Sequence, residues 1–345
     1  MAAPPPDYVW GMTSTPSSTT SAAAQQVAAL VRAGRLCLTT HVNADGDGLG
    51  SEVGLVHILR AQGIEAIITN PTATPERFAF LFADLPGVDK SQQGVKELRR
   101  ADAVLVLDIA DIGRLGALAE TVRERGVPVG CIDHHASVGL LPPGPRYVDD
   151  GAAATGELIF LLARELGWTV PLEAARALYV ALVTDTGGFR FSNTKPRTLQ
   201  IASELLALGV DTEQIYLDIY ASAPAGRPRL LAEVLQTLVV EEPLGLAWVT
   251  VPPGALERHE VDPDDLDGVV EHARSIKGVK LAMLFREMSG GRVKVSLRSV
   301  GRVDVAALAK QFGGGGHTKA AGVAIHGSLA EVQSTVLGAA RAYLA

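Results

Sequence analysis

The sequence predicts an α/β protein, with a mostly parallel sheet in a larger first domain and a smaller α+β domain after it. Short apolar runs alternate with helical patterns along the first half of the chain, which is typical of parallel strands covered on both faces by helices. The length of 345 residues favours two domains over one. A stretch rich in Pro, Gly and Arg separates this half from a later group of strand-like runs, so we expect the domain boundary there.

Strand and helix signals follow one another in the first domain. Apolar runs bounded by polar residues or glycines predict strands at 35–41, 65–70, 103–110 and 128–135. Amphipathic patterns predict helices at 49–63, 117–126, 155–167, 172–187 and 196–209, the last with Gly209 in a position suited to a C-cap. For residues 178–184, periodicity does not decide between a buried helix and a strand.

Composition divides the chain into four segments. Residues 1–21 are rich in Pro, Ser and Thr and predict a disordered N-terminal tail. The larger domain is expected over 22–215, a linker over 216–240 and the smaller domain over 241–345. Within the smaller domain we expect strands at 244–251, 279–288, 291–299 and 320–327, and helices at 268–278 and 303–313.

Charge and cysteine content exclude several classes of protein. The formal net charge of −7 argues against a protein that coats long nucleic acids. The charge is uneven, because residues 271–320 hold ten Lys or Arg and three Asp or Glu, which suits this segment to binding an anion. Cys37 and Cys131 have no second cysteine nearby, which argues against a disulfide framework or a zinc cluster. Because no signal peptide or membrane-spanning stretch is recognisable, we expect a cytoplasmic protein.

Side chains with metal-ligand chemistry follow the expected strands. The stretch "TTHVNADGDGLGSE", residues 39–52, places His41, Asp45 and Asp47 just after the first strand. Loops at the carboxyl edge of a parallel sheet converge, so residues that end different strands can share one site. Further candidates at this edge or after a later apolar run are Asp108, Asp133, His134 and Asp185.

The glycines and the number of acids predict a metal pair. Gly46 and Gly48 permit a positive φ and a close approach of the backbone, so Asp45 and Asp47 can both face one point. Carboxylates packed together repel one another unless a divalent cation offsets their charge. Four Asp and two His suit two ions, and the mixture of carboxylate oxygen and imidazole favours two Mn²⁺ over Zn²⁺.

Each of these motifs also has a structural interpretation. An isolated "DGD" is commonly a turn or a weak calcium-type loop, and an isolated "DHH" can be a loop whose polar groups are simply satisfied by neighbours. Their occurrence together with Asp108 and Asp185, at the edge of the sheet where ligands bind, favours the metal site over both.

A second cluster lies in the basic segment. Four consecutive glycines, Gly313 to Gly316, are costly in a strand or helix and indicate either a flexible linker or a backbone that approaches a ligand. A patterned helix before the run and a strand after it argue against a linker. His317 and Lys319 follow the run, and the guanidinium of Arg298 can grip a phosphate with two hydrogen bonds. We therefore expect a phosphate site here.

These motifs together resemble a known superfamily. "HVNADGDGLGS", "LVLDIAD", "CIDHH" and "VTDTGGFRFSNT" resemble the motifs of the DHH phosphoesterases, and "GGGGHTKAAG" resembles the signature of their DHHA1 domain. The resemblance covers nearly everything from Ala22 to Ala345. The compact two-domain layout looks most like the NrnA group.

The resemblance implies a role for each site residue. His41 and Asp45 would hold one Mn²⁺, Asp47, His134 and Asp185 the other, and Asp108 would bridge the two ions. His135 would face the scissile phosphate, and Asp133 would orient its neighbours. The substrate would be gripped from the second domain by Arg298, Gly315, Gly316 and His317, with Arg190 and Asn193 lining the pocket.

By resemblance, the chain would hydrolyse short oligoribonucleotides to mononucleotides and 3′-phosphoadenosine 5′-phosphate (pAp) to AMP, as a homodimer. Cyclic di-AMP or the dinucleotide pApA are alternative substrates that the sequence does not separate. RecJ-like single-strand exonucleases share the motifs but carry an added nucleic-acid-binding domain, which is not recognisable here. Manganese pyrophosphatases lack the glycine-histidine run. A nucleotide-binding sensor is a non-enzymatic alternative, although such proteins usually lose metal ligands and all six are present.

Overall fold

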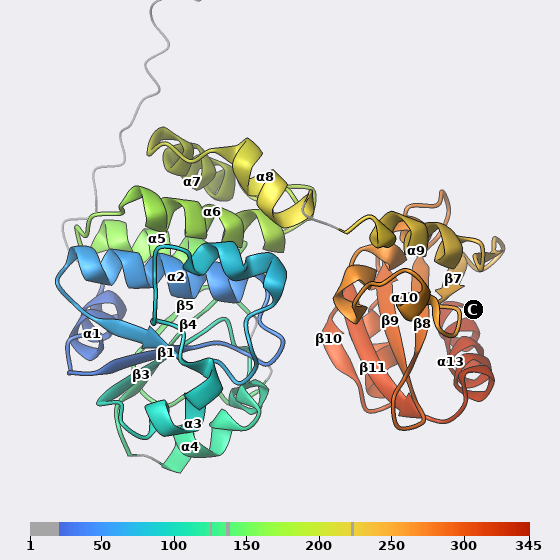
Figure 1. Cartoon of the computed structure of the whole chain (residues 1–345), viewed down its shortest axis with the longest axis horizontal. Coiled ribbons are helices and arrows are strands. Elements are labelled where there is room, and N and C mark those ends of the chain that lie inside the picture. The colour runs from blue at the N-terminus through green and yellow to red at the C-terminus, as the bar shows by residue number, and fades with distance from the viewer. Residues whose placement is uncertain (1–20, 125, 136–138, 222–223) are drawn as a thin grey trace, which may run out of the picture. The chain divides into compact units, whose positions relative to one another are not determined.

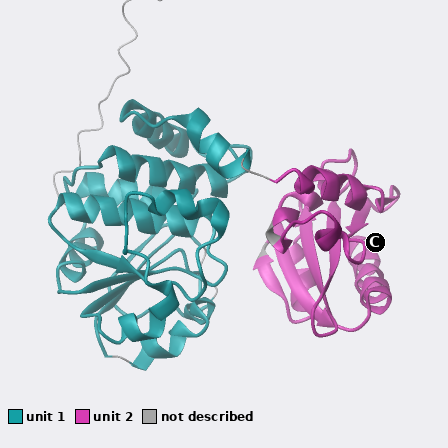
Figure 2. Ribbon diagram, viewed as in Figure 1, with its two compact units in different colours: residues 1–222 teal, residues 223–345 magenta. Residues whose placement is uncertain are grey.

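The computed structural model describes residues 21–124, 126–135, 139–221 and 224–345. The chain forms two compact units, Met1–Ser222 and Ala223–Ala345 (Figure 2). The tail expected over residues 1–21 lies outside the described residues except for Ser21. The hydroxyl of Ser21 accepts the backbone N–H of Ala24 and so caps the first helix, α1 (Ala22–Leu30).

The first unit is built on a parallel sheet with the strand order β2-β1-β3-β4-β5 (Figure 1). Each neighbouring pair is parallel, which confirms the predicted mostly parallel sheet. Its central strands are mostly apolar and fully buried, as expected where helices cover both faces. The strands are β1 (Leu36–Thr39), β2 (Ala66–Ile68), β3 (Ala103–Leu107), β4 (Val129–Asp133) and β5 (Arg146–Val148).

Helices pack on both faces of this sheet (Figure 1). Leu36 and Leu38 of β1 face α2 (Gly46–Ala61), α5 (Thr155–Glu165) and α6 (Leu172–Asp185). Cys37, between them, faces the opposite core with α3 (Gly94–Leu98) and α4 (Leu118–Glu124). The ambiguous residues 178–184 are therefore helical, within α6. The remaining elements are η1 (Glu76–Phe82), η2 (Ser91–Gln93), η3 (Ile112–Leu115), α7 (Pro196–Ala207) and α8 (Thr212–Tyr220).

The second unit is α+β, with a mixed sheet in the order β10-β11-β9-β8-β7-β6. Trp248 of β7 faces α12 (Val305–Lys310) and α13 (Leu329–Leu344), whereas its neighbour Val249 faces α9 (Gly226–Leu235), α10 (Ala255–Arg258), η4 (Pro263–Leu266) and α11 (Val269–Arg274). Each face of the sheet thus has its own buried core. The strands are β6 (Val239–Glu241), β7 (Leu246–Thr250), β8 (Leu281–Met288), β9 (Arg292–Ser299), β10 (Gly315–His317) and β11 (Ala320–His326).

The structure corrects the expected linker over residues 216–240. This segment contains the end of α8, all of α9 and the start of β6. Leu230 and Val234 of α9 are fully buried in the second unit. Gly226 is a packing residue, because a Cβ there would lie 1.9 Å from the carbonyl oxygen of His259. In the described part of this segment, Gly226 and Pro228 therefore mark close packing and the start of a helix.

Candidate metal centre

The loop between β1 and α2 carries the first candidate ligands. His41 follows β1, and Asp45 is the N-cap of α2, where its Oδ1 accepts the backbone N–H groups of Asp47 and Gly48, each at 3.1 Å. The helix begins at Gly46, three residues before the expected start at residue 49. Both Asp45 and Asp47 are thereby fixed at the positive end of α2.

Two roles were expected for Gly46 and Gly48, a positive φ and a close approach of the backbone, and the structure confirms only the second. Neither glycine has a positive φ, because both lie in the first turn of α2. Close approach does require them: a Cβ on Gly46 would lie 2.4 Å from the Cγ2 of Thr184, and a Cβ on Gly48 would lie 2.6 Å from the Oγ1 of Thr40. Gly46 therefore brings the start of α2 against the end of α6, next to Asp185, and Gly48 brings it against Thr40.

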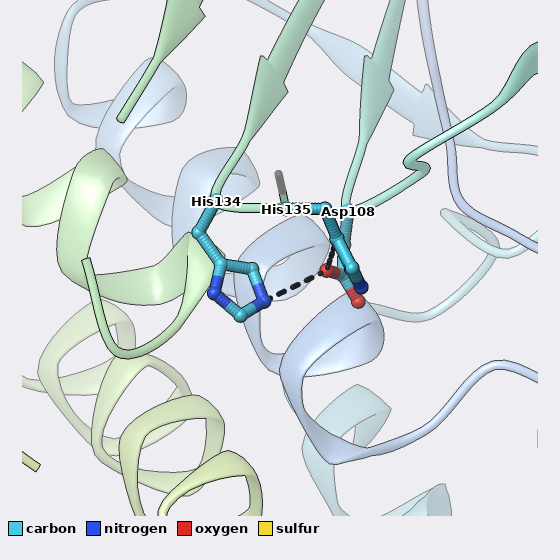
Figure 3. A group of neighbouring side chains, drawn as sticks. All are labelled: Asp108, His134 and His135. Carbon is cyan, nitrogen blue, oxygen red and sulfur yellow. Dashed lines mark ion pairs between the residues drawn. The ribbon is translucent and has the colours of Figure 1, made fainter. Parts of the chain in front are cut away.

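Asp108 lies between the histidines of two different loops. It follows β3, is 2% exposed, and has a φ of +55°, a conformation that Asp tolerates better than most residues. Its Oδ2 lies 3.4 Å from His41 Nε2, and its Oδ1 lies 3.4 Å from His134 Nε2. Figure 3 shows the carboxylate directed toward His134 and beside His135. One carboxylate thus connects two sets of donors.

The second set of donors is held by the start of α5. Asp47 is buried, and its two oxygens accept the backbone N–H groups of Thr155 at 2.7 Å and Gly156 at 3.0 Å. His134 Nε2 lies 3.5 Å from Asp47 Oδ2 and 3.6 Å from Asp185 Oδ2. Thr155 and Gly156 were not predicted as part of the site. They act through backbone N–H groups, which any residue type supplies, so only the predicted start of a helix at residue 155 could have indicated them.

Two groups of donor atoms follow from these contacts. In each group the ligand atoms lie within 4.8 Å of one another. The groups are His41, Asp45 and Asp108, and Asp47, His134 and Asp185; Asp108 also groups with His134 and His135. The structure therefore brings together all six residues expected to ligate metal, with Asp108 between the two sets.

The electrostatics of these groups fit a divalent cation. Burial, and then the nearby charge of Asp108, raises the pKa of Asp47 well above its usual value. Burial also raises the pKa of Asp185, to about 7. For His134, burial lowers the pKa, but Asp108, Asp47 and Asp185 outweigh it and raise the pKa to about 11. The protein thus gathers more carboxylate charge than its own histidines offset, which is the condition that a metal relieves.

Asp133 orients His135. The carboxylate of Asp133 is fully buried; its Oδ2 accepts the backbone N–H of Ala110 at 2.9 Å, and its Oδ1 lies 2.7 Å from Nδ1 of His135. The Nδ1–H of the imidazole donates to this carboxylate, which fixes the ring in one orientation. This is the contact expected of a residue that positions its neighbour.

Asn193 and Arg190 lie beside Asp185 on the segment after α6. The amide nitrogen of Asn193 donates to the backbone oxygens of Asp185 and Ala153, at 3.1 and 3.0 Å. The Nε of Arg190 donates to the backbone oxygen of Gly187 at 2.6 Å. Asn193 therefore supports the backbone of a candidate ligand, while pocket lining by either residue stays a prediction.

The candidate phosphate residues lie in the second unit. Ala320 of β11 pairs with Arg298 of β9 on one side and with the backbone of His317 in β10 on the other, so one strand separates Arg298 from the end of the glycine run. The Nε of Arg298 donates to Oε1 of Glu271 at 3.0 Å, and its Nη1 donates to the backbone carbonyl oxygen of Leu297. The side chain of His317 lies outside the described part of the chain.

The glycine run forms an edge strand. A Cβ on Gly316, where φ is +141°, would lie 2.5 Å from the carbonyl oxygen of Ala320, and one on Gly314 would lie 2.5 Å from that of Gly322. At Gly315 a Cβ would meet no described heavy atom within 4 Å. Packing within the sheet thus explains Gly314 and Gly316, while Gly315 leaves its backbone open to approach. Lys319 donates to the carbonyl oxygens of Gly301 and Val303.

Comparisons with known proteins identify both domains. The model of the DHH family N-terminal domain matches residues 35–182, and the model of the DHHA1 domain matches residues 246–345. The chain is 34% identical to the bifunctional oligoribonuclease and PAP phosphatase NrnA of Thermus thermophilus, over 89% of this chain and 90% of the relative. It is 29% identical to the protein of the same name from Bacillus subtilis, over 84% and 89% of the two chains.

Solved structures show the same fold. An exopolyphosphatase-related protein from Bacteroides fragilis superposes with a TM-score of 0.88 at 27% identity, over 94% of this chain and 96% of that one. RecJ from Thermus thermophilus in complex with Mn²⁺ superposes with a TM-score of 0.58 at 18% identity, over 93% of this chain and 54% of that one. The chain therefore belongs to the DHH phosphoesterase superfamily, with a DHH domain in its first unit and a DHHA1 domain in its second, and its relatives place it in the NrnA group.

Proposed function

We propose that the chain hydrolyses short oligoribonucleotides to mononucleotides and pAp to AMP, using two Mn²⁺ ions. Two relatives that cover most of its length are named oligoribonuclease and PAP phosphatase. The observation that carries the proposal is the pair of three-residue donor groups arranged around Asp108. Oxygen donors with one imidazole in each group suit Mn²⁺ better than Zn²⁺.

Each residue of the candidate site would have a distinct role in the reaction. His41, Asp45 and Asp108 would hold one ion, and Asp47, His134 and Asp185 the second, with Asp108 shared. Two such ions neutralise charge on a phosphoryl group and activate water for in-line attack on phosphorus. His135, whose Nδ1–H is held by Asp133, would face the phosphate with Nε2 and, with that nitrogen also protonated, would donate a hydrogen bond to the phosphate or to the leaving oxygen.

The second unit would bind a phosphate group of the substrate. Arg298 has two hydrogen-bonded nitrogens in the described structure, Nε and Nη1, so Nη2 is the atom with which it would meet a phosphate. The open backbone at Gly315 would approach the same group. A cytoplasmic homodimer is also part of the proposal, on the strength of the resemblance, and light scattering would measure its oligomeric state.

The test is release of AMP from pAp and pApA by the purified chain with Mn²⁺, compared with Asp108→Ala. We expect Asp108→Ala to lower kcat/KM at least about 100-fold, since it removes the shared donor. Glu213→Ala, an exposed acid on α8, is the matched control and should behave as wild type. Equal rates for wild type and Asp108→Ala would contradict the proposal.

Substrate preference needs its own comparison. Initial rates on pAp, pApA, a five-nucleotide RNA, a long RNA and cyclic di-AMP would be measured under one set of conditions. We expect the short linear substrates to be fastest. Faster turnover of long RNA would favour a RecJ-like exonuclease instead, and faster turnover of cyclic di-AMP a cyclic dinucleotide phosphodiesterase.

A further inference from the structure

Asn70 connects the two ends of the loop that carries the first candidate ligands. It follows β2 and is 1% exposed. Its Oδ1 accepts the backbone N–H of Thr40 at 2.9 Å, and its Nδ2 donates to the Oε2 of Glu52 at 2.8 Å. Thr40 immediately precedes His41, and Glu52 lies on α2 five residues after Asp47. One side chain thus joins the start of the loop to the helix at its end.

Asn70 is itself held from the other side. Its backbone N–H donates to the Oγ of Ser91 at 2.9 Å, and the Ser91 hydroxyl donates to Oδ1 of Asp89 at 2.6 Å. Asp89 Oδ2 also accepts the hydroxyl of Thr74 at 3.0 Å. Hydrogen bonds therefore run without interruption from the segment after β2 to the loop beside His41, and a network satisfied in this way is rigid.

The burial of Glu52 costs free energy of folding. It is fully buried, and its Oε1 has no hydrogen-bond partner among the described residues. A buried carboxyl group with a single neutral donor destabilises a fold. Its presence therefore calls for an explanation. Within the described structure the side chain of Asn70 is that donor.

The loop needs such a constraint. It is irregular between Thr40 and Asp45 and includes Asn43 with a φ of +58°. Beyond Asn70, the backbone N–H of Val42 donates to the carbonyl oxygen of Arg114 at 2.8 Å. Metal ligands must be held within about 0.5 Å of their working geometry by surrounding hydrogen bonds. Thr72 Oγ1 accepts the backbone N–H of Asn43 at 3.3 Å, and Asn70 holds Thr40, the residue that directly precedes His41.

We propose that Asn70 is a positioning residue for the metal centre, which sets the distance of His41 from Asp45 and Asp47 by bonding Thr40 and Glu52 at once. The inference rests on the metal centre proposed above. It concerns a residue that touches neither ion nor substrate, and it makes metal affinity depend on an amide beneath the loop.

The test is Mn²⁺ binding to the purified full-length chain, measured by calorimetry for wild type and for Asn70→Leu. Leucine has a similar size but makes neither hydrogen bond, so we expect the dissociation constant to rise about 10- to 100-fold, as for other residues that orient metal ligands. Glu52→Gln keeps an oxygen acceptor for Asn70 and should bind within about twofold of wild type.

A double variant tests the contact directly. Asn70→Asp keeps the acceptor for Thr40 but sets a carboxyl group against Glu52, which should weaken Mn²⁺ binding. Adding Glu52→Gln restores one donor and one acceptor with their places exchanged, and should recover most of the affinity. This pair decides the question if Asn70→Leu does not fold.

Val27→Ala, a buried position on α1, is the control for a general loss of stability. It should lower the melting temperature without changing Mn²⁺ affinity. Wild-type affinity in Asn70→Leu, or an equal loss of affinity in Val27→Ala, would overturn the positioning role alone. Failure of the wild-type chain to bind Mn²⁺ would instead overturn the proposed function, and this inference with it.

Discussion

Asp108 shows at the scale of one residue how the site is built. Its positive φ costs a non-glycine residue on the order of 1 kcal/mol or more, and its burial adds a desolvation cost. In return, its oxygens reach both His41 and His134. These two histidines outweigh burial and lower the pKa of Asp108 well below its usual value. The carboxylate is therefore ionised and ready to accept a cation at neutral pH.

Asp185 predicts a pH dependence of the metal-free fold. Burial raises the pKa of this carboxyl group in the native state to about 7 from its usual 3.8. Between these pH values the native state keeps a proton that the unfolded chain has lost, so raising the pH favours unfolding. The stability that Asp185 contributes is thus fully present below about pH 4 and is lost as the pH rises through 7.

The measurement is thermal unfolding of chelator-treated wild type and Asp185→Asn across this range. We expect the melting temperature of Asp185→Asn to exceed that of wild type by a margin that grows from pH 4 to pH 7. Asp218→Asn on α8 serves as a control acid of the same unit. A constant difference between Asp185→Asn and wild type at all pH values would contradict this prediction.

At the scale of one element, α2 depends on its glycines. Gly46, Gly50 and Gly54 recur every four residues and so lie on one face of the helix. A Cβ on Gly50 would lie 2.5 Å from the backbone oxygen of Ala177, and one on Gly54 would lie 2.6 Å from the side chain of Leu178. The glycine face lets α2 approach α6 closely, which brings Asp47 toward Asp185.

Gly50→Ala should therefore destabilise the protein although alanine is the better helix former. The obstacle is backbone and cannot rotate away, so we expect a loss of about 1–3 kcal/mol in the free energy of unfolding. Gly338→Ala, in α13 with no described heavy atom near its Cβ position, is the matched control and should be neutral or stabilise by about 0.5–1 kcal/mol. Chemical denaturation measures both, and similar effects in the two helices would contradict the packing argument.

Over the whole molecule, the candidate ligands and the candidate anion residues lie in different units. His41, Asp108 and Asp185 belong to the first unit, and Arg298 and Gly315 to the second. Each unit has its own sheet and its own buried core. Because the two sets of residues are in different units, metal binding and substrate binding should respond to different substitutions.

The described helices were also compared with what a membrane span requires, and none has the length and apolar character to cross a bilayer.

Arg298→Lys tests the separation of metal binding from substrate binding. Lysine keeps the charge but lacks the planar guanidinium that, held through Nε and Nη1, would present Nη2 to a phosphate, so we expect KM for pApA to rise about tenfold with little change in kcat. Mn²⁺ affinity should stay at the wild-type value, because the ligands are in the other unit. Steady-state kinetics and calorimetry on the same preparation measure both quantities. A loss of Mn²⁺ affinity in Arg298→Lys would show that the two functions are not separate.

The ligands were predictable from the sequence because their signal is local. His41 and Asp45, like His134, stand at the ends of apolar strands, and parallel strands of one sheet bring such ends to one edge. The supporting residues were not predictable. Asn70 and Thr155 act through hydrogen bonds to distant segments, and a polar residue after a strand or at a helix start looks the same whether or not it makes such bonds.

By itself, the sequence determined the parallel sheet, the succession of most elements, the two domains and the six candidate ligands, because periodicity and residue chemistry are properties of short stretches. Only the tertiary structure decided that residues 178–184 are helical, that the expected linker contains a packed helix, and that Gly46 serves close packing without a positive φ. Those outcomes depend on which surfaces meet, and contacts between distant segments cannot be inferred from the sequence of either segment alone.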